Sequence, residues 1–135
     1  MRILVIAVGR LRPPFQDDSQ HYHKLLAGLG RVDVVEVRED EHVAKRIPDR
    51  AFVILLASDG RCMDSLEFSR WLEERRHEGR DLCFVIGGPR GIDLDRYDLR
   101  LSLGPMTLPH QLARVVLLEQ LFRAHKIIAG QPYHY

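Results

Sequence analysis

Three short aliphatic runs, at residues 2–8, 51–57 and 82–86, limit most strongly what this chain can fold into. Each run is apolar almost throughout, without alternating polar residues, as is typical of a parallel strand covered on both faces. Two further strands are predicted at 32–37 and 98–103, and helices at 17–29, 39–47, 64–79 and 110–129. Strands that alternate with helices predict an α/β protein with helices on both faces of a parallel sheet.

Side chains that accept hydrogen bonds from free backbone N–H groups mark the predicted starts of two helices. Asp17, Asp18 and Ser19 are candidate N-caps of the first helix. Asp64 and Glu67, three residues apart, form a capping-box pattern at the start of the third. The pattern of the third helix places Leu66, Trp71 and Leu72 toward the core. Residues 58–61 are predicted as a turn that ends a strand, and residues 93–97 as one helical turn.

Size and composition indicate one domain that spans residues 1–135. The longest apolar runs fall far short of the roughly 20 residues that cross a membrane, so no membrane partner is expected. Cys62 and Cys83 are too few for a disulfide framework, which favours a reduced, cytoplasmic protein. The net charge of +1 neither supports nor excludes a nucleic-acid partner, because binding depends on local basic patches.

The predicted site lies at the carboxyl ends of the strands, where open parallel sheets bind ligands. Three strand exits are rich in glycine, proline or small residues: 56–60, 87–91 and 103–109. Any one of them alone is more often only a turn, but three in one sheet favour a site. The first strand is not followed by G-x-G-x-x-G, and the chain has no Walker-A loop. These absences disfavour a dinucleotide, flavin or nucleotide module.

The last helix is apolar over more than one face, which indicates burial on more than one side. The second covering surface is either another subunit or, in a monomer, the rest of the same chain. Candidate RNA contacts are Arg10, Arg12, Arg75, Arg76, Arg80, Arg123, His125 and Lys126. For most of these residues, ordinary surface charge is the alternative interpretation.

The C-terminal third resembles a known enzyme family. The residues that carry the resemblance are Ile86-Gly87-Gly88-Pro89-Arg90-Gly91, Leu101-Ser102-Leu103, Met106-Thr107-Leu108-Pro109-His110, Arg114, Glu119-Gln120-Leu121-Phe122-Arg123-Ala124 and Pro132-Tyr133-His134. Their order and spacing are similar to those of the ribosomal RNA large subunit methyltransferase H family, small enzymes of the SPOUT class. The opening Val5-Ile6-Ala7-Val8-Gly9-Arg10 is also similar.

The resemblance implies a C-terminal trefoil knot, which the sequence pattern alone does not predict because knots are rare. It implies a homodimer that uses S-adenosylmethionine, without a metal, to methylate N3 of a pseudouridine in 23S ribosomal RNA. The acceptor is implied to be the assembled ribosome. The implied cofactor contacts are Leu56, Gly88, Gly104, Pro105, Met106, Thr107, Leu108 and Pro109, and they fall on the three strand exits.

Methylation of a pseudouridine N3 requires loss of its proton, so a base or a nearby cation is expected. The candidate catalytic residues are His134, Tyr133, Arg123 and His110. Each has a structural alternative except His134: His110 orders the turn before the last helix, Arg123 pairs with Glu119, and Tyr133 packs its ring.

Two features depart from the family. The chain is shorter than expected, with the loss placed around residues 38–50. The tail Gln131-Pro132-Tyr133-His134-Tyr135 also differs, because relatives often have a histidine before the proline and a charged residue after the last histidine. These departures keep two alternatives open. One is a SPOUT methyltransferase with another RNA acceptor, and the other is a non-catalytic module that binds ribosomes.

Overall fold

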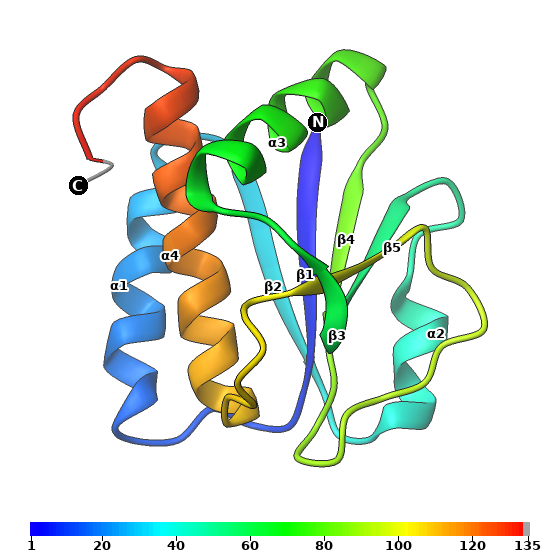
Figure 1. Ribbon diagram of the computed structural model, residues 1–135. Helices are drawn as coiled ribbons and strands as arrows, with labels where there is room; N and C mark the ends of the chain where they lie inside the picture. Colours follow the sequence, from blue (N-terminus) through cyan, green and yellow to red (C-terminus); the bar gives the residue numbers. More distant parts are fainter. Residues whose placement is uncertain (134–135) are drawn as a thin grey trace.

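A computed structural model describes residues 1–133. Five parallel strands form one sheet in the order β2-β1-β4-β3-β5 (Figure 1). The strands are β1 (Arg2–Val8), β2 (Arg31–Val37), β3 (Phe52–Cys62), β4 (Leu82–Ile86) and β5 (Leu99–Ser102). The central strand β4 is buried along its whole length, as its uninterrupted apolar sequence predicts.

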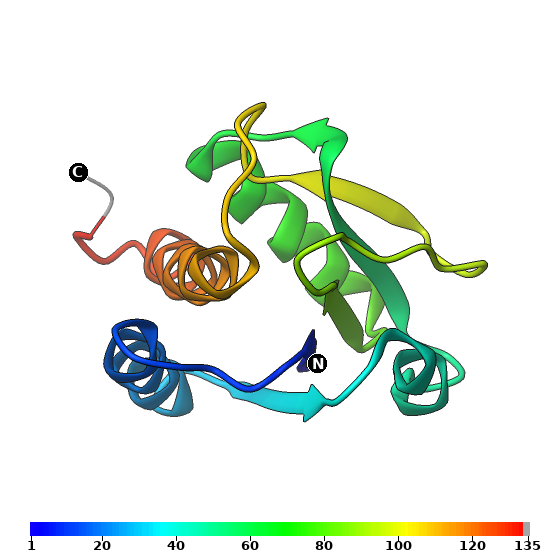
Figure 2. The same cartoon turned by 90° about the horizontal axis from the view of Figure 1, so that it is seen from below.

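Helices cover both faces of this sheet. They are α1 (Phe15–Ala27), a 3-10 turn (Asp40–His42) continued by α2 (Val43–Arg46), α3 (Ser65–Glu78) and α4 (His110–Ile128). Helices α1, α3 and α4 lie on one face, with α4 packed against both of the others, and α2 lies on the opposite face (Figures 1 and 2). The predicted α/β architecture is therefore confirmed, whereas the trefoil knot stays a prediction. Among residues 1–133, no helix has the length and apolarity needed to cross a membrane.

Side chains from successive strand positions enter two separate cores. Phe84 packs with the aromatic residues Phe68 and Trp71 of α3 on one face. Its neighbour Val85 packs with Val43 of α2 on the other face. This alternation follows from the two-residue period of a strand.

The predicted start of α3 is confirmed, and that of α1 is wrong. The Asp64 carboxylate accepts a hydrogen bond from the Glu67 N–H at 2.8 Å. Helix α1, however, begins after Pro14, so the predicted caps at 17–19 lie inside the helix. Trp71 and Leu72 are buried as predicted, but Leu66 is 47 % exposed, because it falls outside the narrow buried stripe of α3.

Residues 58–61 form part of β3, not the predicted exit turn. Strand β3 continues to Cys62 because Arg61 and Cys62 pair with β5 after a register shift. Local turn chemistry does not reveal a pairing with a strand 40 positions away in the sequence.

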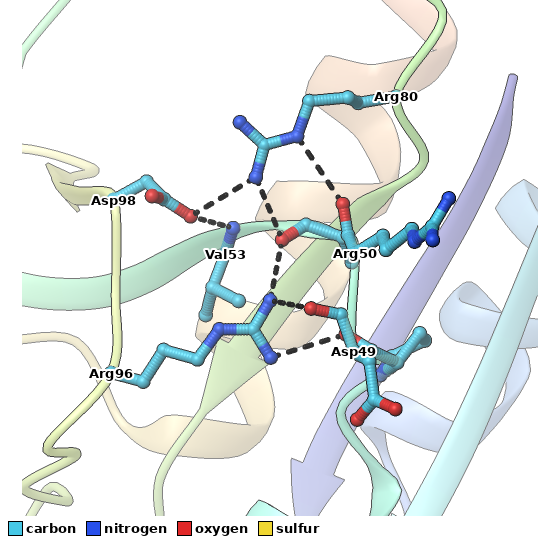
Figure 3. Close-up of polar contacts among 8 residues, drawn as sticks. Asp49, Arg50, Val53, Arg80, Arg96 and Asp98 are labelled. Carbon is cyan, nitrogen blue, oxygen red and sulfur yellow. Dashed lines mark hydrogen bonds and ion pairs between the residues drawn. The ribbon is translucent and has the colours of Figure 1, made fainter.

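Residues 93–97 are also not the predicted helical turn, because Arg96 fixes them to a distant segment (Figure 3). The Arg96 guanidinium donates to the carbonyl oxygens of Pro48, Asp49 and Ala51 at 2.8–3.2 Å. Arg80 donates to the carbonyl oxygens of residues 50 and 51 at 3.2 Å. We call Arg80, Arg96 and Asp98 the arginine clamp; Asp98 accepts from Val53 N–H at 2.8 Å.

Candidate active site

A cavity of about 660 Å³ lies between the irregular part of β3, at residues 56–58, and the carboxyl ends of β4 and β5. The three segments singled out in the sequence, 56–60, 87–91 and 103–109, all contribute to its wall, although 56–60 lies within β3 and is not a strand exit. The lining residues are Leu56, Ala57, Ser58, Ile86, Gly87, Gly88, Pro89, Arg90, Gly91, Leu101, Leu103, Gly104, Met106, Thr107, Leu108, Pro109, His110 and Ala113. Of these, Ala113 lies within α4 and was not singled out in the sequence, because no local signal distinguished it from core residues.

The loop after β4 is a tight turn with little room for side chains. Gly91 N–H donates to Gly88 O at 2.9 Å, with Pro89 and Arg90 at the two central positions. A Cβ on Gly87 would lie 2.7 Å from the carbonyl carbon of Gly91, so only glycine fits there. The turn therefore presents backbone to the cavity and holds Arg90 exposed at its rim.

The buried hydroxyl of Ser102 links strand β3 to the start of the loop after β5. It accepts from Gly104 N–H at 3.1 Å and lies 2.7 Å from Gly104 O and 3.1 Å from Ser58 O. Gly104 has φ +138°, a backbone conformation that favours glycine. The loop 103–109 consequently starts from a fixed point on the cavity wall.

His110 stands where this loop becomes helix α4, and it lines the cavity. Burial lowers the pKa of His110, and the positive charges of Arg114 and Arg12 lower it further. Both effects favour the neutral imidazole, which has a free nitrogen able to accept a proton.

An ion pair between the buried Arg114 and the exposed Glu36 fixes the loop that follows β1. Arg114, 2 % exposed, donates to Glu36 Oε2 at 2.5 Å and to Gly9 O at 3.0 Å. Glu36 also accepts from Leu11 N–H at 3.0 Å. Burial opposes ionisation of Glu36, but Arg114 and the Leu11 amide outweigh it, so the pKa of Glu36 is lowered. This pair was not predicted from the sequence. The available signal was the position of Arg114 among the apolar residues 112–118 of α4, because a buried charge needs a partner.

Most of the implied cofactor contacts come together. Leu56, Gly88, Gly104, Met106, Thr107, Leu108 and Pro109 line the cavity, whereas Pro105 lies in the same loop but not in its wall. Their binding role stays a prediction.

Of the described candidate catalytic residues, Arg123 and Tyr133 come together within one chain, but both lie apart from His110. Arg123 lies 13 positions after His110 on α4, a rise of about 20 Å along a helix. Arg123 pairs with Glu119 at 2.9 Å and donates to Tyr133 O at 3.1 Å. The Tyr133 ring packs edge-on against Phe122, with centroids 4.8 Å apart. His134, the remaining candidate, lies outside the described residues.

The tail thus folds back on the end of α4 that is remote from the cavity (Figure 1). Burial raises the pKa of Tyr133, with smaller contributions from Tyr22 and Glu119. Its hydroxyl therefore stays protonated near neutral pH and is a hydrogen-bond donor there.

Comparison with known proteins agrees with this site. A family model described as predicted SPOUT methyltransferase matches residues 1–134. Proteins named ribosomal RNA large subunit methyltransferase H are similar over nearly their whole length. The relative from Gluconacetobacter diazotrophicus is 43 % identical, over 96 % of this chain and 95 % of its own. Those from Gemmatimonas aurantiaca and Carboxydothermus hydrogenoformans are 39 % and 36 % identical over 99 % of both chains.

The alignments with the last two relatives extend over 153 and 158 positions, so these relatives carry residues that this 135-residue chain lacks. The shortening inferred from the sequence is therefore real, although its placement around 38–50 stays a prediction. The match to the family model covers both the sheet and all three cavity loops. The chain belongs to the SPOUT methyltransferase family.

Proposed function

We propose that this chain transfers a methyl group from S-adenosylmethionine to N3 of a pseudouridine in 23S ribosomal RNA on the assembled ribosome. The observation that carries the proposal is the cavity itself, which gathers loops from three strands of a SPOUT chain. The names of the relatives support ribosomal RNA as the acceptor class. We further propose that the protein acts in the cytoplasm, where its ribosomal substrate is found.

The cavity suits S-adenosylmethionine in size and lining. Its volume of about 660 Å³ lies within the range of about 300–1,000 Å³ typical of small-molecule sites. Leu56, Ile86 and Leu101 offer apolar surface to an adenine ring, and the glycine loops offer backbone groups to its edges. When bound, S-adenosylmethionine supplies an activated methyl group, and the chain's contribution is to hold the acceptor nitrogen in line with it.

The N3 proton of the acceptor must leave as the N–C bond forms. His110 is the described candidate that lines the cavity, and its lowered pKa favours the form that accepts a proton. We therefore assign proton removal first to His110.

Arg123 and Tyr133 then act on the cavity of a second copy. Several apolar residues of α4 remain only partly covered in the single chain: Leu112, Val116, Ile127 and Ile128. Arg123 donates to the Tyr133 carbonyl, so the chain up to Tyr133 is held against α4 before it meets a partner. A homodimer would cover these residues and bring one chain's tail to the other's cavity, as the separation along α4 requires.

Transfer of a labelled methyl group from S-adenosylmethionine tests the proposed reaction. Ribosomes from cells without the modification are the acceptor, with free subunits and transfer RNA as parallel substrates. We expect label in N3-methylpseudouridine on whole ribosomes, identified by mass spectrometry of nucleosides. Label in no RNA at all, with S-adenosylmethionine bound, would contradict the proposal and leave a ribosome-binding module.

A mixed dimer tests the shared site. Gly88→Phe disables the cavity, and Arg123→Ala with Tyr133→Ala disables the tail. Co-expression of the two variants under different tags should restore about a quarter of wild-type activity, because half the dimers are mixed and each has one intact site. Activity no greater than that of either variant alone would contradict a site shared between copies.

One observation favours a second candidate function, a methyltransferase with another RNA acceptor. The relatives carry residues that this chain lacks, and a smaller surface grips a ribosome less. Methylation of transfer RNA or free subunits in preference to whole ribosomes, in the same substrate panel, would support this alternative.

A further inference from the structure

The structure divides the arginines proposed as RNA contacts into two groups. Several are already held by other protein groups. Arg75 lies over the Phe52 and Trp71 rings and 3.0 Å from Glu78 Oε1. Arg80 binds backbone carbonyls in the arginine clamp, and Arg123 pairs with Glu119.

Arg10 and Arg12 belong to the second group. Both side chains are exposed, and among the described residues neither has an ion-pair or hydrogen-bond partner for its guanidinium. They follow β1 at the carboxyl edge of the sheet, the edge that forms the cavity. Arg12 lies near enough to His110 to lower its pKa.

The backbone that carries these two arginines is fixed to the start of α4. The Gln111 side chain accepts from Arg12 N–H at 2.9 Å and donates to Arg10 O at 3.2 Å. Beneath it, Arg114 holds Gly9 O, and Glu36 holds Leu11 N–H. The loop is thus bonded at four consecutive residues, 9–12, and its backbone is ordered before a ligand arrives.

Arg90 adds a third exposed guanidinium on the neighbouring loop, where it lines the cavity. Three arginines that form no ion pair with a described residue therefore stand beside the cavity, two of them on a fixed backbone. The Glu36 carboxylate is near enough for the charge of Arg10 to lower its pKa, but Glu36 is paired with Arg114. Such an arrangement suits the phosphate groups of a nucleic-acid strand, because guanidinium donors match two phosphate oxygens at once.

We propose that Arg10 and Arg12 bind phosphodiester groups of the RNA strand beside the target nucleoside and so position that nucleoside over the cavity. This inference rests on the proposed function for the identity of the strand. It assigns a positioning role, since neither side chain lines the cavity. Gln111 and the Arg114–Glu36 pair hold the backbone that carries these side chains.

The test compares ribosome binding by the wild type, R10A/R12A, R10K/R12K and R46A/R70A over a series of KCl concentrations. Arg46 on α2 and Arg70 on α3 are exposed and have no ion-pair partner among residues 1–133, so R46A/R70A removes the same charge elsewhere. Co-sedimentation with ribosomes measures binding without methyl transfer. Calorimetry measures the affinity for S-adenosylmethionine.

We expect R10A/R12A to bind ribosomes about tenfold more weakly at low salt, with a log-affinity salt slope smaller by about 1.5. Its affinity for S-adenosylmethionine should equal the wild-type value. R10K/R12K should keep the wild-type salt slope, because lysine keeps the charge. R46A/R70A should bind ribosomes within about twofold of the wild type.

Equal salt slopes for R10A/R12A and the wild type would overturn the inference, as would an equal loss in R46A/R70A. If the wild type binds ribosomes through these arginines but transfers no methyl group, the proposed function fails and the phosphate contacts of Arg10 and Arg12 stand. If the wild type binds no ribosomes, both fail.

Discussion

Arginines gather at both edges of the sheet, and the two edges use them differently. At the amino edge, where β3, β4 and β5 begin, Arg80 and Arg96 donate to the backbone carbonyls of residues 48–51 (Figure 3). At the carboxyl edge, Arg10, Arg12 and Arg90 are exposed beside a cavity. The arginines of the amino edge therefore stabilise the backbone, as the buried Arg114 also does at Gly9, whereas the exposed arginines of the carboxyl edge are left available for a ligand.

The difference follows from the backbone at each edge. The chain enters β3 through residues 48–51 without a long helix, and the arginine clamp supplies partners for carbonyl groups there. The carboxyl-edge loops satisfy their own backbone through tight turns and through Ser102 and Gln111. Their arginines are consequently not needed for the fold.

Substitution of Gly88 should give the largest effect, at the carboxyl edge alone. A Cβ on Gly88 meets only Val8 Cγ1, at an ordinary 3.6 Å, so the variant should fold. The phenyl ring of Gly88→Phe should intrude on the cavity and weaken S-adenosylmethionine binding at least about 100-fold. Calorimetry checks the affinity, with Gly28→Phe, an exposed glycine of negative φ outside the cavity, as control. An unchanged affinity for S-adenosylmethionine in Gly88→Phe would contradict the assignment of the loop 87–91 to the cofactor site.

At the amino edge, Arg96→Ala should lower stability without changing the affinity for S-adenosylmethionine. It removes three hydrogen bonds to carbonyls, two of them exposed, and should lower the free energy of unfolding by about 1–2 kcal/mol. Urea denaturation measures this loss, and S-adenosylmethionine affinity should not change. In Figure 3 the Arg50 guanidinium points away from the clamp. Arg50→Ala is therefore the control, expected within about 0.5 kcal/mol of the wild type. A clamp variant as stable as this control would refute the structural role of Arg96.

The pH dependence of stability is expected to be the smallest effect, and it separates the two ends of α4. Burial lowers the pKa of His110 at one end and of His125 at the other. The unfolded chain then binds these protons more tightly, so stability is full above about pH 6.5 and falls as pH drops through the folded-state values. His125 is the more buried of the two and should contribute more to the pH dependence of stability. His125→Gln should therefore reduce that dependence more than His110→Gln. Urea titrations at pH 7.5 and 5.5 check this; an unchanged pH dependence in His125→Gln would contradict it.

The sequence predicted those parts of the molecule that local chemistry determines. The continuous aliphatic runs predicted β1 and β4. The segments 56–60, 87–91 and 103–109, rich in glycine, proline or small residues, predicted where the cavity lies. It could not predict features that depend on distant partners. Arg61 is in a strand only because β5 lies beside it, and Arg96 bonds residues nearly 50 positions away.

The sequence for the same reason did not show that the candidate catalytic residues lie in two separate places. Arg123 and His110 are close in sequence but belong to opposite ends of one rigid helix. The contacts of the buried Arg114 with Glu36 and Gly9 join α4 to β2 and to the loop after β1, and no local motif marks them.

Hydrogen exchange with and without S-adenosylmethionine tests most directly whether the carboxyl edge of the sheet binds the ligand while the amino edge serves the fold alone. We expect S-adenosylmethionine to slow amide exchange in residues 87–91 and 103–110 and to leave the exchange of residues 48–52 and 96–98 unchanged. The measurement is made at a ligand concentration that calorimetry shows to be saturating. Protection confined to the amino edge, or no change in the cavity loops, would contradict the assignment of the site.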